Sequence, residues 1–217
     1  EDPAHEGQGL MQFVTEQISG DDVKAITSLV EKHQRTGMVV VELGTYTGRS
    51  ALAMLPVIQR AEGHLYCVDW FRGNTGVEAE IGQSYRSHDI LKILRQNLME
   101  AVGQGLDADR VTIMVGKTVG AALVFPDRSV DVLFVDADHR YSQVKADLAA
   151  WLPKMKTSGL VFGHDFEKHL EECDLEAAIE HCEEDYSGGC HYGVIRAVSE
   201  QFEKVHRDGR IWWTNVR

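Results

Sequence analysis

The sequence predicts an α/β fold in which helices cover both faces of a mostly parallel β-sheet. Residues 38–43 form an apolar, β-branched run that is typical of a strand buried on both faces. Glycines follow this run, and a helical pattern then begins at Ser50. Short apolar runs and helical patterns continue to alternate along the chain, and the C-terminal part contains a charged hairpin around Asp208 and Gly209. We therefore expect a parallel sheet that ends in an antiparallel hairpin.

Length and composition are those of an ordinary globular protein. The chain has 217 residues, of which 43% are hydrophobic and 26% charged. We expect a flexible tail over residues 1–19 and a single domain over 20–217. The net charge of −12 argues against a nucleic-acid partner, because phosphate binding requires a basic face. The lack of a long apolar run or a signal segment argues against a membrane partner and favours a cytoplasmic protein.

The first predicted helix covers residues 21–33, and the first strand and its glycine turn follow it. Backbone N–H groups and the positive end of the next helix then meet at the carboxyl edge of the sheet, which is the usual ligand position in an open α/β fold. A pyrophosphate ligand would need a third glycine where Tyr46 stands, between Gly44 and Gly48. The turn therefore favours a ligand other than a dinucleotide.

The second predicted strand, residues 64–69, ends in an acid. Asp69 follows Gly48 by 21 residues, and an acid at that spacing accepts hydrogen bonds from ribose hydroxyls in nucleotide-like sites. Its neighbour Trp70 either covers an adenine ring or packs in the core. Residues 71–88 are polar and glycine-rich, which is typical of a binding lid.

Ionisable residues gather after two later strands. A helix over 88–102 and a strand over 110–115 are followed by a strand over 130–135. Asp136, Asp138 and His139 crowd the end of that strand, and three such residues within four positions serve no packing purpose. The strand that begins near residue 156 ends in His164 and Asp165.

The C-terminal part is predicted to hold a helix over 175–182 and strands over 192–198 and 211–214. A zinc site formed by Cys182, Cys190 and His191 is disfavoured, because their spacing does not match a zinc knuckle.

Three of these segments resemble one enzyme family. Residues 42–48 resemble the first motif of class I S-adenosylmethionine (SAM)-dependent methyltransferases. Residues 136–141, with the helix after them, and residues 193–198 resemble a small-molecule O-methyltransferase subfamily that includes macrolide-sugar O-methyltransferases and cephalosporin-hydroxylase-like proteins. The resemblance covers roughly residues 20–217 and implies a Rossmann-like class I methyltransferase sheet with a C-terminal antiparallel hairpin.

The resemblance implies a SAM site and an acceptor site. The expected SAM contacts are Glu42, Gly44, Thr45, Tyr46, Gly48, Ser50, Asp69, Trp70, Gly116, Lys117, Thr118 and Asp136. His139 is the expected general base for a hydroxyl acceptor, because its ordinary pKa lies near working pH and Asp136 or Asp138 can orient it.

A divalent metal, Mg²⁺ or Mn²⁺, is a further expectation, held by Asp136, His164 and Asp165. Imidazole is a poor Mg²⁺ ligand, so a metal-free site in which these groups only bind substrate stays open.

Two other functions also stay open. One is an NAD(P)-type oxidoreductase, which the antiparallel end of the sheet disfavours; the other is a non-catalytic SAM-binding module. The expected partner is a small-molecule acceptor that the sequence does not specify. The oligomeric state is open, with a homodimer as one candidate.

Overall fold

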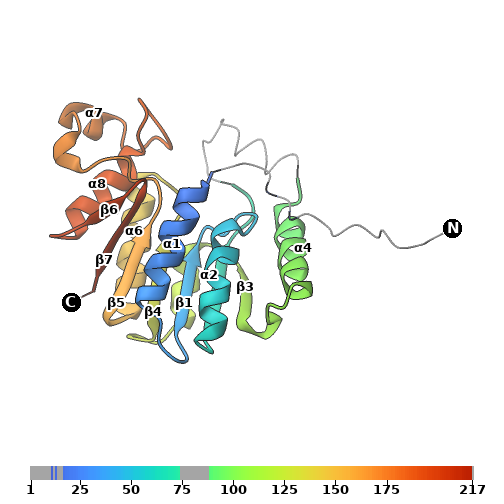
Figure 1. Ribbon diagram of the computed structural model, residues 1–217. Helices are drawn as coiled ribbons and strands as arrows, with labels where there is room; N and C mark the ends of the chain where they lie inside the picture. Colours follow the sequence, from blue (N-terminus) through green and yellow to red (C-terminus); the bar gives the residue numbers. More distant parts are fainter. Residues whose placement is uncertain (1–10, 12, 14–16, 74–87, 217) are drawn as a thin grey trace.

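A seven-stranded β-sheet organises the part of the chain that the computed structural model describes, residues 11, 13, 17–73 and 88–216 (Figure 1). In chain order the strands are β1 (Val39–Leu43), β2 (His64–Asp69), β3 (Val111–Val115), β4 (Val130–Val135), β5 (Met155–Gly163), β6 (His206–Asp208) and β7 (Ile211–Asn215). Their order across the sheet is β3-β2-β1-β4-β5-β7-β6. Strands β1 to β5 pair in parallel, whereas β7 is antiparallel to both β5 and β6.

This order confirms the predicted parallel sheet with an antiparallel C-terminal hairpin. It also differs from the dinucleotide-binding order 3-2-1-4-5-6, because β7 lies between β5 and β6.

Helices cover both faces of the sheet. The α-helices are α1 (Gly20–Lys32), α2 (Arg49–Arg60), α4 (Ile90–Gly103), α5 (Thr118–Ala121), α6 (Tyr141–Trp151), α7 (Leu175–Glu180) and α8 (Tyr192–Gln201). Short 3₁₀ helices span Ala108–Arg110, Ala122–Val124, Leu152–Lys154 and Leu170–Glu172. Helices α1 and α2 lie on one face, and α6 and α8 lie on the other (Figure 1). None of the described helices has the length and apolar character needed to cross a bilayer.

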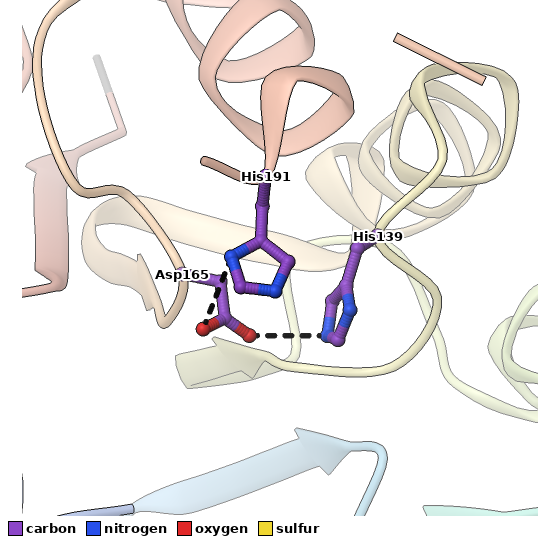
Figure 2. Close-up of side chains that lie close together, drawn as sticks. All are labelled: His139, Asp165 and His191. Carbon is purple, nitrogen blue, oxygen red and sulfur yellow. Dashed lines mark ion pairs between the residues drawn. The ribbon is translucent and has the colours of Figure 1, made fainter. Parts of the chain in front are cut away.

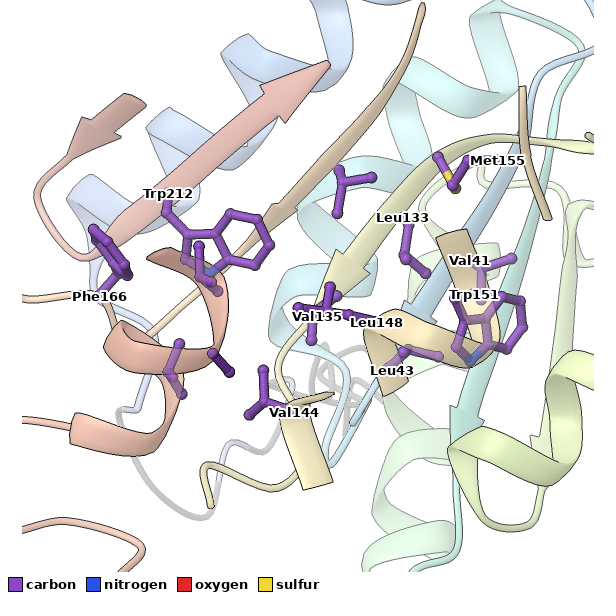
Figure 3. Packing of buried hydrophobic residues seen from close by; sticks show 14 of the residues in the cluster. Val41, Leu43, Leu133, Val135, Val144, Leu148, Trp151, Met155, Phe166 and Trp212 are labelled. Atoms are coloured by element: carbon purple, nitrogen blue, oxygen red, sulfur yellow. The ribbon is translucent and has the colours of Figure 1, made fainter. Parts of the chain in front are cut away.

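Successive side chains of a strand point to opposite faces of the sheet, so the hydrophobic core is divided into two clusters, one on each face. Val40 packs with α1 and α2, whereas Val41 and Leu43 pack with α6. Figure 3 shows the second cluster, in which Leu148 and Trp151 of α6 lie against the central strands. Because both faces of the central strands are covered, polar ligands meet these strands at their carboxyl ends.

Helix α1 begins with a capping box. The Ser19 hydroxyl accepts a hydrogen bond from the Asp22 backbone N–H, and the Asp22 carboxylate accepts one from the Ser19 backbone N–H. The box also fixes the Asp22 carboxylate above the carboxyl end of β5, where it contacts His164.

One predicted element is wrong: residues 192–198 form helix α8 rather than a strand. The β-branched Val194 and Ile195 favoured a strand, but most residues of this segment are buried between α6 and the loop after β4. A Cβ on Gly193 would lie 2.2 Å from the His139 carbonyl oxygen, so glycine allows the helix to approach that loop. The strand paired with β7 is instead β6.

The other expected elements agree with the structure to within a few residues. Helix α4 begins at Ile90, where Asp89 caps it by accepting a hydrogen bond from the Lys92 backbone N–H. Most of the predicted lid, 74–87, and residues 1–9 of the predicted tail lie outside the described residues.

Candidate functional site

A cavity opens at the carboxyl edge of the sheet, where the loops after β1, β2, β4 and β5 meet. Gly44, Asp69 and His139 line this one cavity, as the sequence predicted. Every other predicted site residue also lines it, except Glu42 and Gly48. The remaining lining residues that were predicted are Thr45, Tyr46, Ser50, Trp70, Gly116, Lys117, Thr118, Asp136, Asp138, His164 and Asp165.

Gly44 allows the loop after β1 to touch the loop after β4. Its φ is +85°, and a Cβ there would lie 2.0 Å from the Asp136 carbonyl oxygen. The Asp136 backbone N–H in turn donates to the Leu43 carbonyl at 2.9 Å. The packing of these two loops therefore requires glycine at this position, in addition to any contact that it makes with a ligand.

Asp69 joins the loops that follow β1 and β2. Its Oδ2 accepts a hydrogen bond from the Tyr46 backbone N–H at 2.9 Å, and its Oδ1 accepts one from the Phe71 N–H at 2.7 Å. Tyr46 and Phe71 both have positive φ, at 50° and 56°. Non-glycine residues adopt this region at a cost, so the carboxylate holds two strained turns in place at the rim of the cavity.

Glu42 lies below the cavity rather than at its surface. It is fully buried, and its Oε1 accepts a short hydrogen bond from the Ser50 hydroxyl. Burial raises the pKa of Glu42 to about 7, and the nearby charges of Asp136 and Asp69 act in the same direction. Glu42 thus braces the start of α2 through Ser50.

The opposite side of the loop after β2 is covered by residues that follow β3. The Lys117 ammonium lies 5.2 Å from the centre of the Trp70 ring, in a cation–π contact. Thr118 donates a short hydrogen bond to the buried Asp147 of α6, and burial raises the pKa of Asp147 to about 7.

The carboxylate of Asp165 is the centre of an ionic cluster. One oxygen lies 3.1 Å from His139 Nε2, and the other lies 3.1 Å from His164 Nδ1 and 3.5 Å from His191 Nδ1. Figure 2 shows His139 and His191 on two sides of this carboxylate. The Arg210 guanidinium lies 3.4 Å from the same group. The φ of Asp165 is +60°, so this carboxylate stands on a strained backbone.

Each histidine of the cluster also contacts a second carboxylate. Asp185 Oδ1 lies 3.1 Å from His139 Nδ1, and Asp22 Oδ2 lies 3.3 Å from His164 Nε2. Glu167 Oε1 lies 2.7 Å from Nδ1 of the third, His191.

These neighbours shift the pKa values strongly. Burial alone would lower the pKa of His139, but Asp165 and the other carboxylates around it raise that pKa well above its ordinary value. Burial also opposes the charge of His164, yet Asp165 and Asp22 raise its pKa to about 10. Although burial alone would raise the pKa of Asp165, the histidines hold it well below its usual range. These shifts favour the ionised forms of His139, His164 and Asp165.

Of the two acids expected to orient His139, Asp136 lies 3.9 Å from its Nε2, whereas Asp138 binds Arg140 instead. Its carboxylate binds Arg140 through two side-chain hydrogen bonds of 3.0 and 2.6 Å and also accepts the Arg140 backbone N–H at 3.0 Å. Asp185 occupies the orienting position on His139 instead.

Sequence reasoning missed five members of the cluster, which are Asp22, Glu167, Asp185, His191 and Arg210. Asp22 belongs to the capping box of α1, so its sequence position indicates only a role in capping that helix. Glu167 and Asp185 lie in loops without a periodic pattern, and His191 was considered only with two cysteines. Only the fold brings these residues together.

Asp136, His164 and Asp165 form a group that fits a divalent metal. One donor atom from each lies within 4.8 Å of the others. His164 Nδ1 is 3.1 Å from Asp165 and 3.7 Å from Asp136. Two carboxylates and one imidazole suit Mn²⁺, Fe²⁺ or Zn²⁺ better than Mg²⁺.

The family model described as "Methyltransferase domain" matches residues 41–166, which is more than half of the chain. The chain belongs to this methyltransferase family. The matched segment runs from β1 to the residue after Asp165, so it contains the cavity-lining loops after β1, β2, β4 and β5.

Solved structures give this methyltransferase its fold class. The O-methyltransferase TomG from Streptomyces achromogenes, involved in tomaymycin synthesis and solved with SAM, is 17% identical; the match covers 92% of this chain and 82% of TomG, with a TM-score of 0.61. An O-methyltransferase from Bacillus cereus in complex with SAH is 16% identical, with 95% and 84% covered and a TM-score of 0.59. The sheet is therefore the Rossmann-like sheet of class I methyltransferases.

The methyltransferase also matches a curated relative, the uncharacterized protein y4gI of Sinorhizobium fredii. The two are 30% identical over 131 residues, which is 59% of this chain. The matched part is 13% of that much longer relative.

Proposed function

We propose that this methyltransferase moves the methyl group of SAM to a hydroxyl oxygen of a small molecule, with His139 as general base and divalent-metal assistance. One observation carries the proposal. The glycine loop after β1, the strand-end acid Asp69 and the ionic cluster around His139 line one cavity at the carboxyl edge of a methyltransferase sheet. Tyr46 in the glycine loop and β7 between β5 and β6 disfavour the NAD(P) alternative.

The proposed cofactor half of the cavity lies between the loops after β1, β2 and β3. Asp69 accepts two backbone hydrogen bonds but still has lone pairs that can accept ribose hydroxyls. Trp70 and Lys117 are proposed to lie beside the adenine, and Asp136 to face the methionyl part. Glu42 is proposed to act indirectly, by holding Ser50 and the start of α2.

The proposed acceptor half lies beside the loop after β4. Methyl transfer is a direct displacement in which the sulfonium already activates the methyl group, so the protein must align the acceptor and remove its proton. His139 Nε2 faces the carboxylates at the cavity, while Asp185 holds the proton on Nδ1. One nitrogen of His139 is therefore fixed by Asp185, and the other lies at the cavity, where it also pairs with Asp165.

The raised pKa of His139 must fall before this residue can accept a proton. Its cause is the negative charge of Asp165 and its neighbours. A divalent metal held by Asp136, His164 and Asp165 would supply positive charge there, which lowers the pKa of both His139 and an acceptor hydroxyl. We propose that these three residues have that role.

Calorimetry with SAM tests the proposal. The wild-type protein should release or absorb heat and gain thermal stability on SAM addition, and Asp69→Ala should weaken binding by about 10-fold or more. Asp127→Ala is the matched control, because Asp127 is exposed, pairs with Lys154 and precedes β4 at the other edge of the sheet. His139→Gln should keep SAM binding and lose turnover.

Each failure of this experiment has a distinct meaning. If SAM produces neither heat nor a thermal shift, the proposal is wrong, and a shift with NAD(P) instead would favour the oxidoreductase. Binding of SAM together with full turnover in His139→Gln would reject the base. Binding without turnover on any hydroxyl acceptor would leave a SAM-binding module.

A further inference from the structure

A second group of potential metal ligands includes two residues that line the cavity and one that lies outside its lining. His139, Asp165 and His191 come from three separate segments, yet one donor atom of each lies within 4.8 Å of the other two. Figure 2 shows the His191 ring above Asp165 and beside His139, and the two ring centres are 4.7 Å apart. His191 does not line the cavity, so the SAM site does not explain its position.

Both histidines of this group have one nitrogen fixed by a dedicated carboxylate. His139 Nδ1 pairs with Asp185 at 3.1 Å, and His191 Nδ1 pairs with Glu167 at 2.7 Å and lies farther from Asp165, at 3.5 Å. Glu167 also accepts the His191 backbone N–H at 3.1 Å. Histidines that bind metals commonly place their other N–H on a carboxylate, which leaves the Nε2 lone pair for the ion.

We propose that His139, Asp165 and His191 form a metal site for a divalent transition ion such as Zn²⁺, Co²⁺ or Fe²⁺. Two imidazoles and one carboxylate prefer such ions to Mg²⁺. Two atoms bound to one tetrahedral ion at about 2.0–2.1 Å lie roughly 3.3 Å apart. His139 Nε2 and Asp165 Oδ2 are already 3.1 Å apart, so this pair can accept an ion with little movement.

The local charge supports a cation at this position. The carboxylates of Asp136, Asp165, Glu167 and Asp185 surround the two histidines, and three of them contact a ring nitrogen within 3.1 Å. The Arg210 guanidinium contacts only one oxygen of this set, at 3.4 Å from Asp165, within the described residues. When the two histidines are neutral as metal ligands, a divalent ion in place of their protons balances the negative charge of these carboxylates.

Asp165 belongs both to the new site and to the group Asp136, His164 and Asp165. The new site has His139 and His191 in place of Asp136 and His164. One consequence rests on the proposed function. The ion and the acceptor proton would compete for the same His139 nitrogen, so a bound Zn²⁺ ion should inhibit methyl transfer. His191→Ala should relieve that inhibition.

Equilibrium dialysis and visible spectroscopy with Co²⁺ test the site directly. The metal-free full-length protein should bind Co²⁺ in excess Mg²⁺ and develop the absorption bands of imidazole-bound cobalt. His191→Ala should lower Co²⁺ affinity by about 100-fold, and Glu167→Gln by about 10-fold. His181→Ala is the matched control, because His181 also pairs with a glutamate, Glu184, at 2.8 Å but is not a member of either group of potential metal ligands. It should bind Co²⁺ as the wild type does.

Unchanged Co²⁺ affinity in both His191→Ala and Glu167→Gln would overturn the site. If His191→Ala does not fold, anomalous diffraction from wild-type crystals soaked in Co²⁺ decides the question. A peak bonded to His139 and His191 supports the site; a peak bonded only to Asp136 and His164, or no peak, overturns it. Calorimetry with SAM in EDTA keeps this outcome separate from that of the proposed function.

Discussion

The two rims of the cavity hold their acids in different ways. The nucleotide-side rim, formed by the loops after β1 and β2, holds Asp69 with backbone N–H groups of its own and the adjacent loop. The ionic rim, formed by the loops after β4 and β5, holds Asp165 with three histidines and an arginine, and one of these histidines, His191, lies outside the cavity lining. The first rim depends on local backbone geometry, whereas the second depends on charged side chains contributed by distant parts of the sequence.

We propose that this difference separates a binding surface from a reactive one. Backbone donors keep Asp69 in place without adding charge, which suits recognition of neutral hydroxyls. Charged side chains around Asp165 shift several pKa values together, which suits proton and metal chemistry.

The largest expected effect is the difference in folding stability between Asp165→Asn and Asp69→Asn. Asp165→Asn keeps the side-chain size and tolerates positive φ, but it leaves buried charged histidines without their carboxylate. We expect it to destabilise the metal-free protein by about 3–5 kcal/mol. Asp69→Asn should cost less, because an amide oxygen still accepts one backbone hydrogen bond. Urea unfolding of both variants in EDTA measures this difference. Equal losses of stability in the two variants would contradict the distinction between the two rims.

A second test concerns the contact between the two rims. Gly44→Ala places a Cβ against the Asp136 carbonyl at a φ of +85°, so the loop after β1 must move away from β4. We expect a loss of about 2–4 kcal/mol in stability from backbone strain and overpacking. Gly116→Ala is a control on the same cavity, since a Cβ there meets no atom within 4 Å. Equal stability of the two variants would show that the rims do not depend on this contact.

The sequence predicted the nucleotide-side rim well because its determinants are local. The apolar run before Gly44 defines β1, and the spacing of Asp69 from Gly48 follows from one βαβ unit. The end of β4 was also visible, because Asp136 and His139 follow a buried strand directly.

The ionic rim was only half predictable. His191 reaches Asp165 because Gly193 lets α8 pack closely on the loop after β4. The β-branched residues of α8 led to the prediction of a strand there instead of a helix. A helical spacing did exist in the pair Arg196 and Glu200, which are four residues apart and hydrogen-bonded at 2.9 Å. No local pattern indicates that Asp185 would meet His139.

A third prediction uses the pH dependence of Glu42. Its pKa is raised to about 7 by burial, so the carboxyl favours folding most below its unfolded value of 4.5 and loses that contribution as pH rises through 7. Glu42→Gln cannot ionise, so its stability relative to the wild type should grow between pH 4.5 and 7 and then level off, by up to about 3 kcal/mol. Urea unfolding of the cofactor-free proteins from pH 4.5 to 8 measures this. Parallel curves for the two proteins would contradict the raised pKa.

The smallest expected effect concerns the orientation of His139. Because Asp185 contacts His139 and Asp138 binds Arg140, Asp185→Asn should lower kcat by about 10-fold or more, and Asp138→Asn should lower it less. Asp138→Asn should also cost about 1 kcal/mol of stability or less. Steady-state kinetics on one hydroxyl acceptor compare the two variants. A larger loss of kcat in Asp138→Asn would restore Asp138 as the orienting residue.

A crystal structure with S-adenosylhomocysteine tests the central claim most directly. We expect the ribose hydroxyls within hydrogen-bond distance of the Asp69 carboxylate, and the sulfur atom on the side of the cavity that holds Asp136 and His139. A ligand bound elsewhere, or one whose ribose lies against Asp165 instead, would contradict the division of this cavity into a nucleotide-side rim and an ionic rim.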